Sequence, residues 1–202
     1  MSFWDQRYDT KDYVFGTAPN AFLARQAERL KGFKTALAIA DGEGRNGVWL
    51  AEQGLDVTSL DNSPVGLKKA EALAASRGVQ LTPLLADIGA FDWTARAYDA
   101  VVGIFFQFAP PDMRAAIFAG MKQAVRPGGL ILIEGYRPEQ LAYGTGGPRE
   151  IDNLYTEPLL REAFGDFEIT TLQSYDAELS EGAGHKGPSA VIDLVARRPV
   201  LG

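Results

Sequence analysis

Hydrophobic positions along the chain form two patterns that alternate. Short, almost continuous apolar runs are separated by longer stretches in which apolar residues recur at helical spacing. Strands buried on both faces of a parallel sheet have such continuous runs, so the alternation predicts parallel strands joined by helices. The predicted strands span residues 35–40, 56–61, 79–87, 97–106 and 130–136, and the predicted helices span residues 18–32, 45–54, 64–78, 110–125 and 157–164.

The end of the chain has a different pattern. Two apolar runs, residues 167–180 and 189–199, flank the glycine-rich segment 181–188 and predict a closing pair of strands. Residues 137–156 show the weakest periodicity, and long loops in compact domains are often functional. No internal repeat or low-complexity linker divides the sequence, so we expect a single α/β domain over residues 1–202.

A glycine-rich turn follows the first predicted strand. The segment "ADGEGRNG" contains Gly42-x-Gly44-x-x-Gly47 directly after "TALAIA". Such a turn lets the backbone approach a ligand, and the helix that follows favours negative charge at its amino-terminus. The spacing alone is a weak signal. Asp61 adds to it, because a carboxylate at the end of the next strand can accept hydrogen bonds from both hydroxyls of an adenosine ribose.

Two acidic residues in the turn help to separate the possible ligands. Asp41 and Glu43 would oppose the pyrophosphate of a dinucleotide, with Arg45 as the nearby cation. S-adenosylmethionine has no phosphate and carries a cationic sulfonium and amino group, so the acidic turn favours it, unless both acids face water. Asp87 ends the third predicted strand and could accept a hydrogen bond from an adenine amino group, or it could cap a turn.

The ordered motifs resemble the class I S-adenosylmethionine-dependent methyltransferases. The segments "ADGEGRN", "SLDNS", "LLADI", "YDAVVGIFF" and "AVRPGGLILIEGY" carry this resemblance, which runs from about residue 3 to residue 198. The start "FWDQRYDTKDYVFGTAPNAFL", the loop "GTGGP" and the late segment "EGAGHKGPSAVIDLVARRP" are similar to bacterial tellurite-resistance and thiopurine methyltransferases. The resemblance implies a three-layer α/β/α sandwich around a Rossmann-like, seven-stranded, mostly parallel sheet whose last strand is antiparallel.

The resemblance also implies S-adenosylmethionine as cofactor and assigns roles to residues. Gly42 and Gly44 would hold the methionine part, Asp61 and Asn62 the ribose, and Asp87 the adenine. The whole expected cofactor site comprises Tyr13, Gly16, Asp41, Gly42, Gly44, Arg45, Asn46, Asp61, Asn62, Ala86, Asp87, Ile88 and Phe105. Residues 1–17, with Trp4 and Tyr8, would cover the cofactor as a lid, or would simply pack on the core. Ala38 and Ala40 depart from the family, which commonly has an acid and a glycine there.

Methyl transfer from a sulfonium is an in-line displacement, so most of the rate can come from positioning and from excluding water. A general base is needed only if the acceptor arrives protonated. His185 is the one side chain whose ordinary pKa lies near neutrality, and it would act as a base, contact the substrate, or remain a solvated loop residue. Arg137 could orient an anionic substrate. We therefore take His185 and Arg137 as catalytic candidates.

The composition of the chain excludes or disfavours several classes of site and partner. The 202 residues carry a net charge of −6, one histidine and no cysteine, so we expect no metal site and no thiolate nucleophile. The absence of a basic run disfavours nucleic acid as a partner. No apolar stretch is long enough for a membrane span, and the polar start lacks a secretory signal, so we expect a cytoplasmic protein.

We predict a methyltransferase that acts on a small molecule, such as an oxyanion or a thiol-like nucleophile, as a monomer or weak dimer. One alternative is an NAD(P)-dependent oxidoreductase, which the lack of a Tyr-x-x-x-Lys pair disfavours. The other is a cofactor-binding protein without transferase activity, which Ala38 and the unsettled base leave open.

Overall fold

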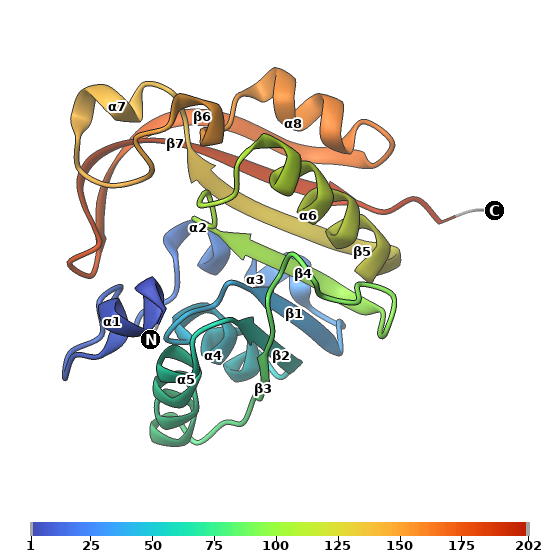
Figure 1. The fold of residues 1–202 in the computed structure, drawn as a ribbon. Coiled ribbons are helices and arrows are strands. Elements are labelled where there is room, and N and C mark those ends of the chain that lie inside the picture. Colours follow the sequence, from blue (N-terminus) through green and yellow to red (C-terminus); the bar gives the residue numbers. More distant parts are fainter. Residues whose placement is uncertain (1, 201–202) are drawn as a thin grey trace.

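The computed structural model describes residues 2–200. Its centre is a seven-stranded sheet with the strand order β3-β2-β1-β4-β5-β7-β6 (Figure 1). The strands are β1 (Thr35–Ile39), β2 (Asp56–Asp61), β3 (Thr82–Leu85), β4 (Tyr98–Ile104), β5 (Val125–Tyr136), β6 (Glu168–Glu181) and β7 (His185–Arg197). All neighbouring strands are parallel except β7, which is antiparallel to both β5 and β6. The predicted mostly parallel sheet with an antiparallel last strand is confirmed.

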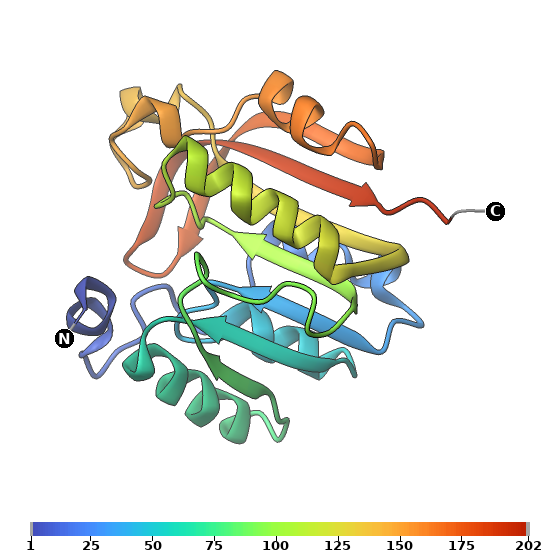
Figure 2. The same ribbon diagram turned by 45° about the vertical axis from the view of Figure 1, so that its right-hand side comes forward.

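Helices cover both faces of this sheet (Figures 1 and 2). They are α1 (Phe3–Tyr8), α2 (Ala21–Ala24), α3 (Ala27–Leu30), α4 (Arg45–Glu52), α5 (Pro64–Ser76), α6 (Pro111–Ala124), α7 (Gln140–Tyr143), the 3₁₀ turn η1 (Ile151–Asn153) and α8 (Glu157–Phe164). Side chains of α6 and α8 form one core with the sheet, and side chains of α2, α3 and α4 form a second core on the other face. The three-layer α/β/α arrangement is therefore confirmed, and it explains why the central strands are apolar on both faces.

Local chemistry sets several of the helix starts. Ser63 caps α5, because its Oγ accepts a hydrogen bond from the Gly66 amide, and Pro64 occupies the first helical position. Thr156 caps α8 in the same way through the Leu159 amide. Such caps fix where each helix leaves the preceding strand or loop.

The single helix predicted for residues 18–32 is wrong, because the structure has the two short helices α2 and α3 there. The Nε2 of Gln26 donates to the carbonyl of Phe22, which an uninterrupted helix would use for a backbone hydrogen bond. The third strand is also shorter than predicted. It lies at the edge of the sheet, where Pro83 is tolerated because an edge strand has amides without sheet partners.

The closing strands are longer than predicted. The predicted loop 181–188 reduces to a turn at residues 182–184, so His185 is the first residue of β7 rather than a loop residue. Strand β5 likewise begins at Val125, with a register irregularity where it pairs with β4. Residues 137–156, predicted as a loop, contain α7 and η1.

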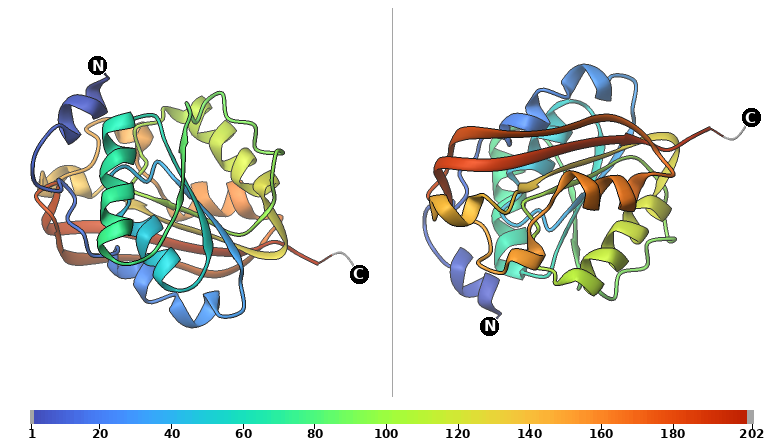
Figure 3. Two further views of the ribbon diagram at one scale, coloured as in Figure 1. Left: turned by 90° about the horizontal axis from the view of Figure 1, so that it is seen from below. Right: turned by 90° about the horizontal axis from the view of Figure 1, so that it is seen from above.

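The order of strands creates a crevice at one edge of the sheet. Strands β1 and β4 are neighbours, yet the chain continues from them to opposite sides, and open α/β sheets bind ligands at such a point. Helix α1 and the turn between β6 and β7 lie at this same edge (Figure 3), and the Gly184 amide donates to the carbonyl of Val14 at 3.1 Å. The edge is thereby covered by segments from both ends of the chain.

Candidate active site

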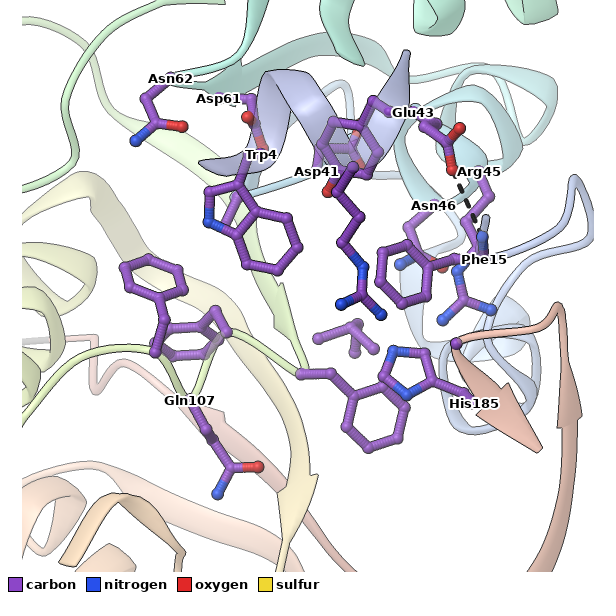
Figure 4. A pocket seen from close by; sticks show the side chains of 18 of the residues that line it. Trp4, Phe15, Asp41, Glu43, Arg45, Asn46, Asp61, Asn62, Gln107 and His185 are labelled. Atoms are coloured by element: carbon purple, nitrogen blue, oxygen red, sulfur yellow. Dashed lines mark hydrogen bonds between the residues drawn. The ribbon is translucent and has the colours of Figure 1, made fainter. Parts of the chain in front are cut away.

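A cavity of about 580 Å³ lies at the carboxyl ends of the central strands, a size typical of small-molecule sites. The turn after β1, the ends of β2 and β4, the N-terminal segment, residues 146–150 and the β6–β7 turn all contribute to its walls. Ten of the residues expected from the sequence line it: Gly16, Asp41, Arg45, Asn46, Asp61, Asn62, Ala86, Ile88, Phe105 and His185. Figure 4 shows Asp61 and Asn62 at one end of the cavity and His185 with Phe15 at the other.

Asp61 joins the end of β2 to the glycine-rich turn. Its Oδ2 accepts a hydrogen bond from the Gly42 amide at 2.8 Å, and its Oδ1 accepts one from the Ser63 amide at 2.9 Å. Burial raises the pKa of Asp61 above its ordinary value. A carboxylate has about four lone-pair positions, so Asp61 keeps acceptor capacity for a ligand hydroxyl.

Asp41 is anchored in the same turn. Its Oδ1 accepts from the Gly47 amide at 3.1 Å and its Oδ2 from the hydroxyl of Ser59 at 2.7 Å. Burial raises the pKa of Asp41 to about 6. Asp41 therefore remains an acid that faces the cavity from the turn, as the sequence suggested.

Glu43, the second acid of the turn, is already paired with a cation of the protein. Its carboxylate pairs with the ammonium of Lys69 on α5 and accepts from the Phe15 amide at 3.3 Å. Arg45, the cation nearest to the two acids in sequence, pairs with Glu181 at 2.8 Å, so it does not neutralise Glu43. The acidic character of the turn consequently depends on Asp41 and Asp61, with Glu43 neutralised by a residue distant in sequence.

Gly42 and Gly44 do not line the cavity, although the sequence assigned them to the cofactor. Both have positive φ, and both allow another element to approach. A Cβ on Gly42 would lie 2.5 Å from the hydroxyl of Tyr8, and a Cβ on Gly44 would lie 2.4 Å from the Cβ of Ala70. The two glycines therefore let α1 and α5 pack closely against the turn.

Three other expected residues also lie outside the cavity lining. The hydroxyl of Tyr13 donates to the carbonyl of Lys69. Asp87 is exposed, and its Oδ1 accepts from the Gly89 amide at 2.8 Å, which is the turn-capping alternative. Arg137, a catalytic candidate, forms an ion pair with Asp176 and is therefore not available to orient a substrate in this cavity.

His185 sits between two aromatic rings. Its ring centroid lies 4.7 Å from that of Phe15 and 4.4 Å from that of Phe105. Its Nδ1 lies 2.6 Å from the hydroxyl of Tyr136. Burial and the nearby guanidinium groups of Arg45 and Arg7 lower the pKa of His185 to about 3. The imidazole is therefore neutral at physiological pH.

The tautomer of His185 follows from its partner. Within residues 2–200, the buried hydroxyl of Tyr136 has one hydrogen-bond partner, the Nδ1 of His185. Burial raises the pKa of Tyr136, so this hydroxyl keeps its proton and donates it to Nδ1. We assign the remaining hydrogen of the neutral ring to Nε2. His185 is then a hydrogen-bond donor at the cavity, an arrangement that does not suit a general base.

Several lining residues were not singled out as ligands from the sequence. Arg7 places its guanidinium 5.3 Å from the centroid of Phe15 and 5.8 Å from that of Trp4. Trp4, Arg7 and Tyr8 lie three and four positions apart, so they share one face of α1, and this spacing was an available signal. Gln107 also lines the cavity, but its amide is engaged by the backbone of Tyr136 and Asn153.

A buried acidic network adjoins the cavity through Arg45, a lining residue that pairs with Glu181. Glu181 accepts from the side chain of Asn20, which also donates to Glu134. Glu134 and Asp193 lie directly opposite in the pairing of β5 with β7. Burial and the charge of Asp193 raise the pKa of Glu134 well above its usual range, so Glu134 stays protonated. The sequence signal was a single acid within each apolar run, "LILIEGY" and "AVIDLVA".

Known proteins share both sequence and architecture with this chain. A family described as a methyltransferase domain matches residues 36–129. A carboxy-S-adenosyl-L-methionine synthase from Geobacter metallireducens is 26% identical over 123 residues, which cover 59% of this chain and 48% of that protein. The chain thus spans about half the length of the curated relative that it matches.

Solved structures extend the likeness to the whole fold. TehB from Haemophilus influenzae has a TM-score of 0.73 and 21% identity, over 97% of this chain and 66% of its own. The N-methyltransferase NodS from Bradyrhizobium japonicum, in complex with S-adenosyl-L-homocysteine, has a TM-score of 0.75 and 15% identity, over 98% of this chain and 97% of its own. At these identities the structural likeness concerns the fold. The family match thus concerns a methyltransferase domain over residues 36–129, and the solved structures show that nearly the whole chain shares the fold of these methyltransferases.

Proposed function

We propose that the protein transfers the methyl group of S-adenosylmethionine to a small-molecule acceptor in the cavity of about 580 Å³. The observation that carries this proposal is the position of Asp61, which lies at the end of β2, is bonded to the glycine-rich turn and faces the cavity. Asp61 and Asn62 would hold the ribose hydroxyls. Ala86 and Ile88 would flank the adenine, and Asp41 would face the cationic amino group of the methionine part.

The reaction needs little covalent chemistry from the protein. When bound, S-adenosylmethionine supplies the methyl group: its S–CH₃ bond breaks as the acceptor's lone pair bonds to the methyl carbon, and S-adenosylhomocysteine is released. The residues of this chain hold the reactants in line and exclude water. Trp4 and Phe15 of the N-terminal segment would form the outer wall, in the role of a lid, and Phe105 the inner wall beside the reacting atoms.

The acceptor would carry no proton on its nucleophilic atom at neutral pH. His185, with its pKa lowered to about 3, cannot remove a proton there, and its Nε2–H would instead donate to the acceptor. Aromatic walls suit a polarisable nucleophile. An oxyanion, or a thiol-like nucleophile that reacts as its thiolate, meets these conditions.

The remaining expectations belong to the same proposal. A net charge of −6 supports a small molecule rather than a nucleic acid as partner. Within residues 2–200, no helix combines the length and apolar character that crossing a membrane requires. We propose action in the cytoplasm, as a monomer or weak dimer.

Calorimetric titration with S-adenosylhomocysteine and, separately, with NADH tests the proposal. We expect binding of the first and none of the second. Replacing Asp61 by alanine should weaken the binding of S-adenosylhomocysteine by roughly 1–3 kcal/mol, because a buried polar group loses its partner. Asp56→Ala is the matched control, since Asp56 lies exposed at the opposite end of the same strand. Wild-type affinity in a folded Asp61→Ala variant would remove Asp61 from the site, and tight binding without turnover over a panel of thiols and oxyanions would indicate a non-catalytic protein.

A further inference from the structure

Among the cations around the cavity, Arg7 differs in having no anionic partner within residues 2–200. Arg45 pairs with Glu181, and Lys69 pairs with Glu43. Within residues 2–200, the guanidinium of Arg7 forms neither an ion pair nor a hydrogen bond, and it rests against the rings of Phe15 and Trp4. Arg7 also lines the cavity. An uncompensated guanidinium held by aromatic rings at a ligand cavity is suited to an anionic group of the ligand.

The position of Arg7 indicates which part of a ligand it meets. Arg7 covers the ring of Phe15, and this ring is stacked on that of His185. The backbone amide of Phe15 donates a hydrogen bond to Glu43 in the glycine-rich turn. This is the end of the cavity opposite Asp61 and Asn62 (Figure 4). The lowered pKa of His185 agrees with this placement, because the charge of Arg7 is one of its causes. A ligand whose ribose reaches Asp61 extends its amino-acid part toward Arg7.

The carboxylate is the single anionic group of S-adenosylmethionine. Its sulfonium and amino group are cationic, and Asp41 and Asp61 face the cavity as acids. Without a cation, the ligand's carboxylate would be placed among like charges, which is unfavourable in a partly buried site. A guanidinium can bind a carboxylate through two parallel hydrogen bonds, which fixes its orientation as well as its charge.

We propose, resting on the proposed function, that Arg7 binds the carboxylate of the cofactor's methionine part. Arg7 belongs to α1, the helix that covers the cavity edge, so the covering segment itself recognises the amino-acid end of the cofactor. Arg7 thereby distinguishes S-adenosylmethionine from adenosine compounds that lack the carboxylate.

The test compares two ligands that differ in this group alone. S-adenosylmethionine and decarboxylated S-adenosylmethionine share the adenosine, the sulfonium and the amino group. We would measure both dissociation constants by calorimetry or competition for the wild type, Arg7→Gln and Lys11→Gln. Lys11→Gln is the matched control, because it removes one exposed charge from the same segment and Lys11 does not line the cavity.

We expect the wild type and Lys11→Gln to prefer S-adenosylmethionine by about 10- to 150-fold, the range for hydrogen bonds between charged groups. Arg7→Gln should lose most of this preference while its affinity for the decarboxylated compound changes less than about threefold. An unchanged preference in Arg7→Gln would overturn the proposal, and Arg7 would then be a candidate for binding the methyl acceptor. Equal losses for both ligands would also overturn it, because Arg7 would then act only on the shape of the lid. A wild type that binds neither compound would instead reject the proposed function.

Discussion

Replacing Gly44 by alanine would reveal how tightly the glycine-rich turn is packed against α5. Gly44 is the N-cap of α4 and has φ 85°, a left-handed conformation. The added Cβ would lie 2.4 Å from the Cβ and 2.7 Å from the Cα of Ala70, whereas ordinary contact begins at 3.4 Å. The turn and α5 must therefore separate by about 1 Å, since Ala70 has no flexible side chain that could move aside.

Two contributions determine the size of the effect. Left-handed backbone costs an L-residue about 1–2 kcal/mol, offset by about 0.4–1 kcal/mol because alanine restricts the unfolded chain. Overpacking against a rigid neighbour costs about 1–3 kcal/mol more. We therefore expect the free energy of unfolding to fall by about 1–5 kcal/mol.

Urea unfolding with one matched variant separates the two contributions. Gly54 has φ 88° and no atom within 4 Å of an added Cβ, so Gly54→Ala measures the backbone term alone. Gly44→Ala should be the less stable variant by about 1–3 kcal/mol. If both variants unfolded at the same urea concentration with equal slopes, close packing on α5 would not be the reason for glycine at position 44.

Two further variants test the support of the cavity. Lys69→Met removes the partner of buried Glu43 and of three backbone carbonyls in residues 8–12, so it should lower the free energy of unfolding by roughly 3–5 kcal/mol. It should also speed trypsin cleavage of the N-terminal segment, whereas the control Lys68→Met, at an exposed position, should not. Equal cleavage of the two variants would reject this role of Lys69. Glu134 has a raised pKa in the folded state, so the native protein keeps a proton that the unfolded chain loses. The free energy of unfolding should therefore fall as the pH rises above the ordinary pKa of a glutamate, by up to about 1.4 kcal/mol per pH unit. Glu134→Gln keeps the neutral form and should flatten this slope in urea unfolding between about pH 5 and pH 8, whereas an unchanged slope would assign the proton elsewhere.

The architecture could be predicted because its signals are local. Each central strand is a continuous apolar run, and most helices begin at a recognisable cap or proline, as Ser63 and Pro64 illustrate. Predictions failed where a distant or competing group decided the outcome. The break between α2 and α3 depends on the side chain of Gln26, and the early start of β7 depends on pairing with Glu181 across a three-residue turn.

The candidate site was predictable at the strand ends and not beyond them. The roles of Asp41 and Asp61 follow directly from their positions, just after β1 and at the end of β2. The partners that decide what each side chain does lie far away in sequence: Lys69 neutralises Glu43, Asp176 engages Arg137, and Tyr136 sets the tautomer of His185. A sequence pattern specifies which residues reach the cavity edge, but it does not specify which of them are already satisfied by another residue.

The strongest conflict between local preference and fold lies at the cavity itself. Ala40 and Phe105 are the two non-glycine residues with positive φ in residues 2–200, at 48° and 52°. Each directly follows one of the two strands, β1 and β4, between which the crevice opens. Such conformations cost of order 1–3 kcal/mol and persist where neighbours impose them. Here the Asp41 amide is bonded to the carbonyl of Leu60, and the Phe105 amide to that of Glu134.

These two bends have the same structural consequence. By turning sharply directly after the last strand residue, the chain directs Asp41 into the glycine-rich turn and places the ring of Phe105 against Tyr136 and His185. Glycine at position 40 would make the first bend without strain, yet alanine stands there and lines the cavity. A bend at the end of a central strand is therefore required by the order of the strands, whichever residue occupies it, because a chain that continued straight would fill the crevice in which a ligand must lie.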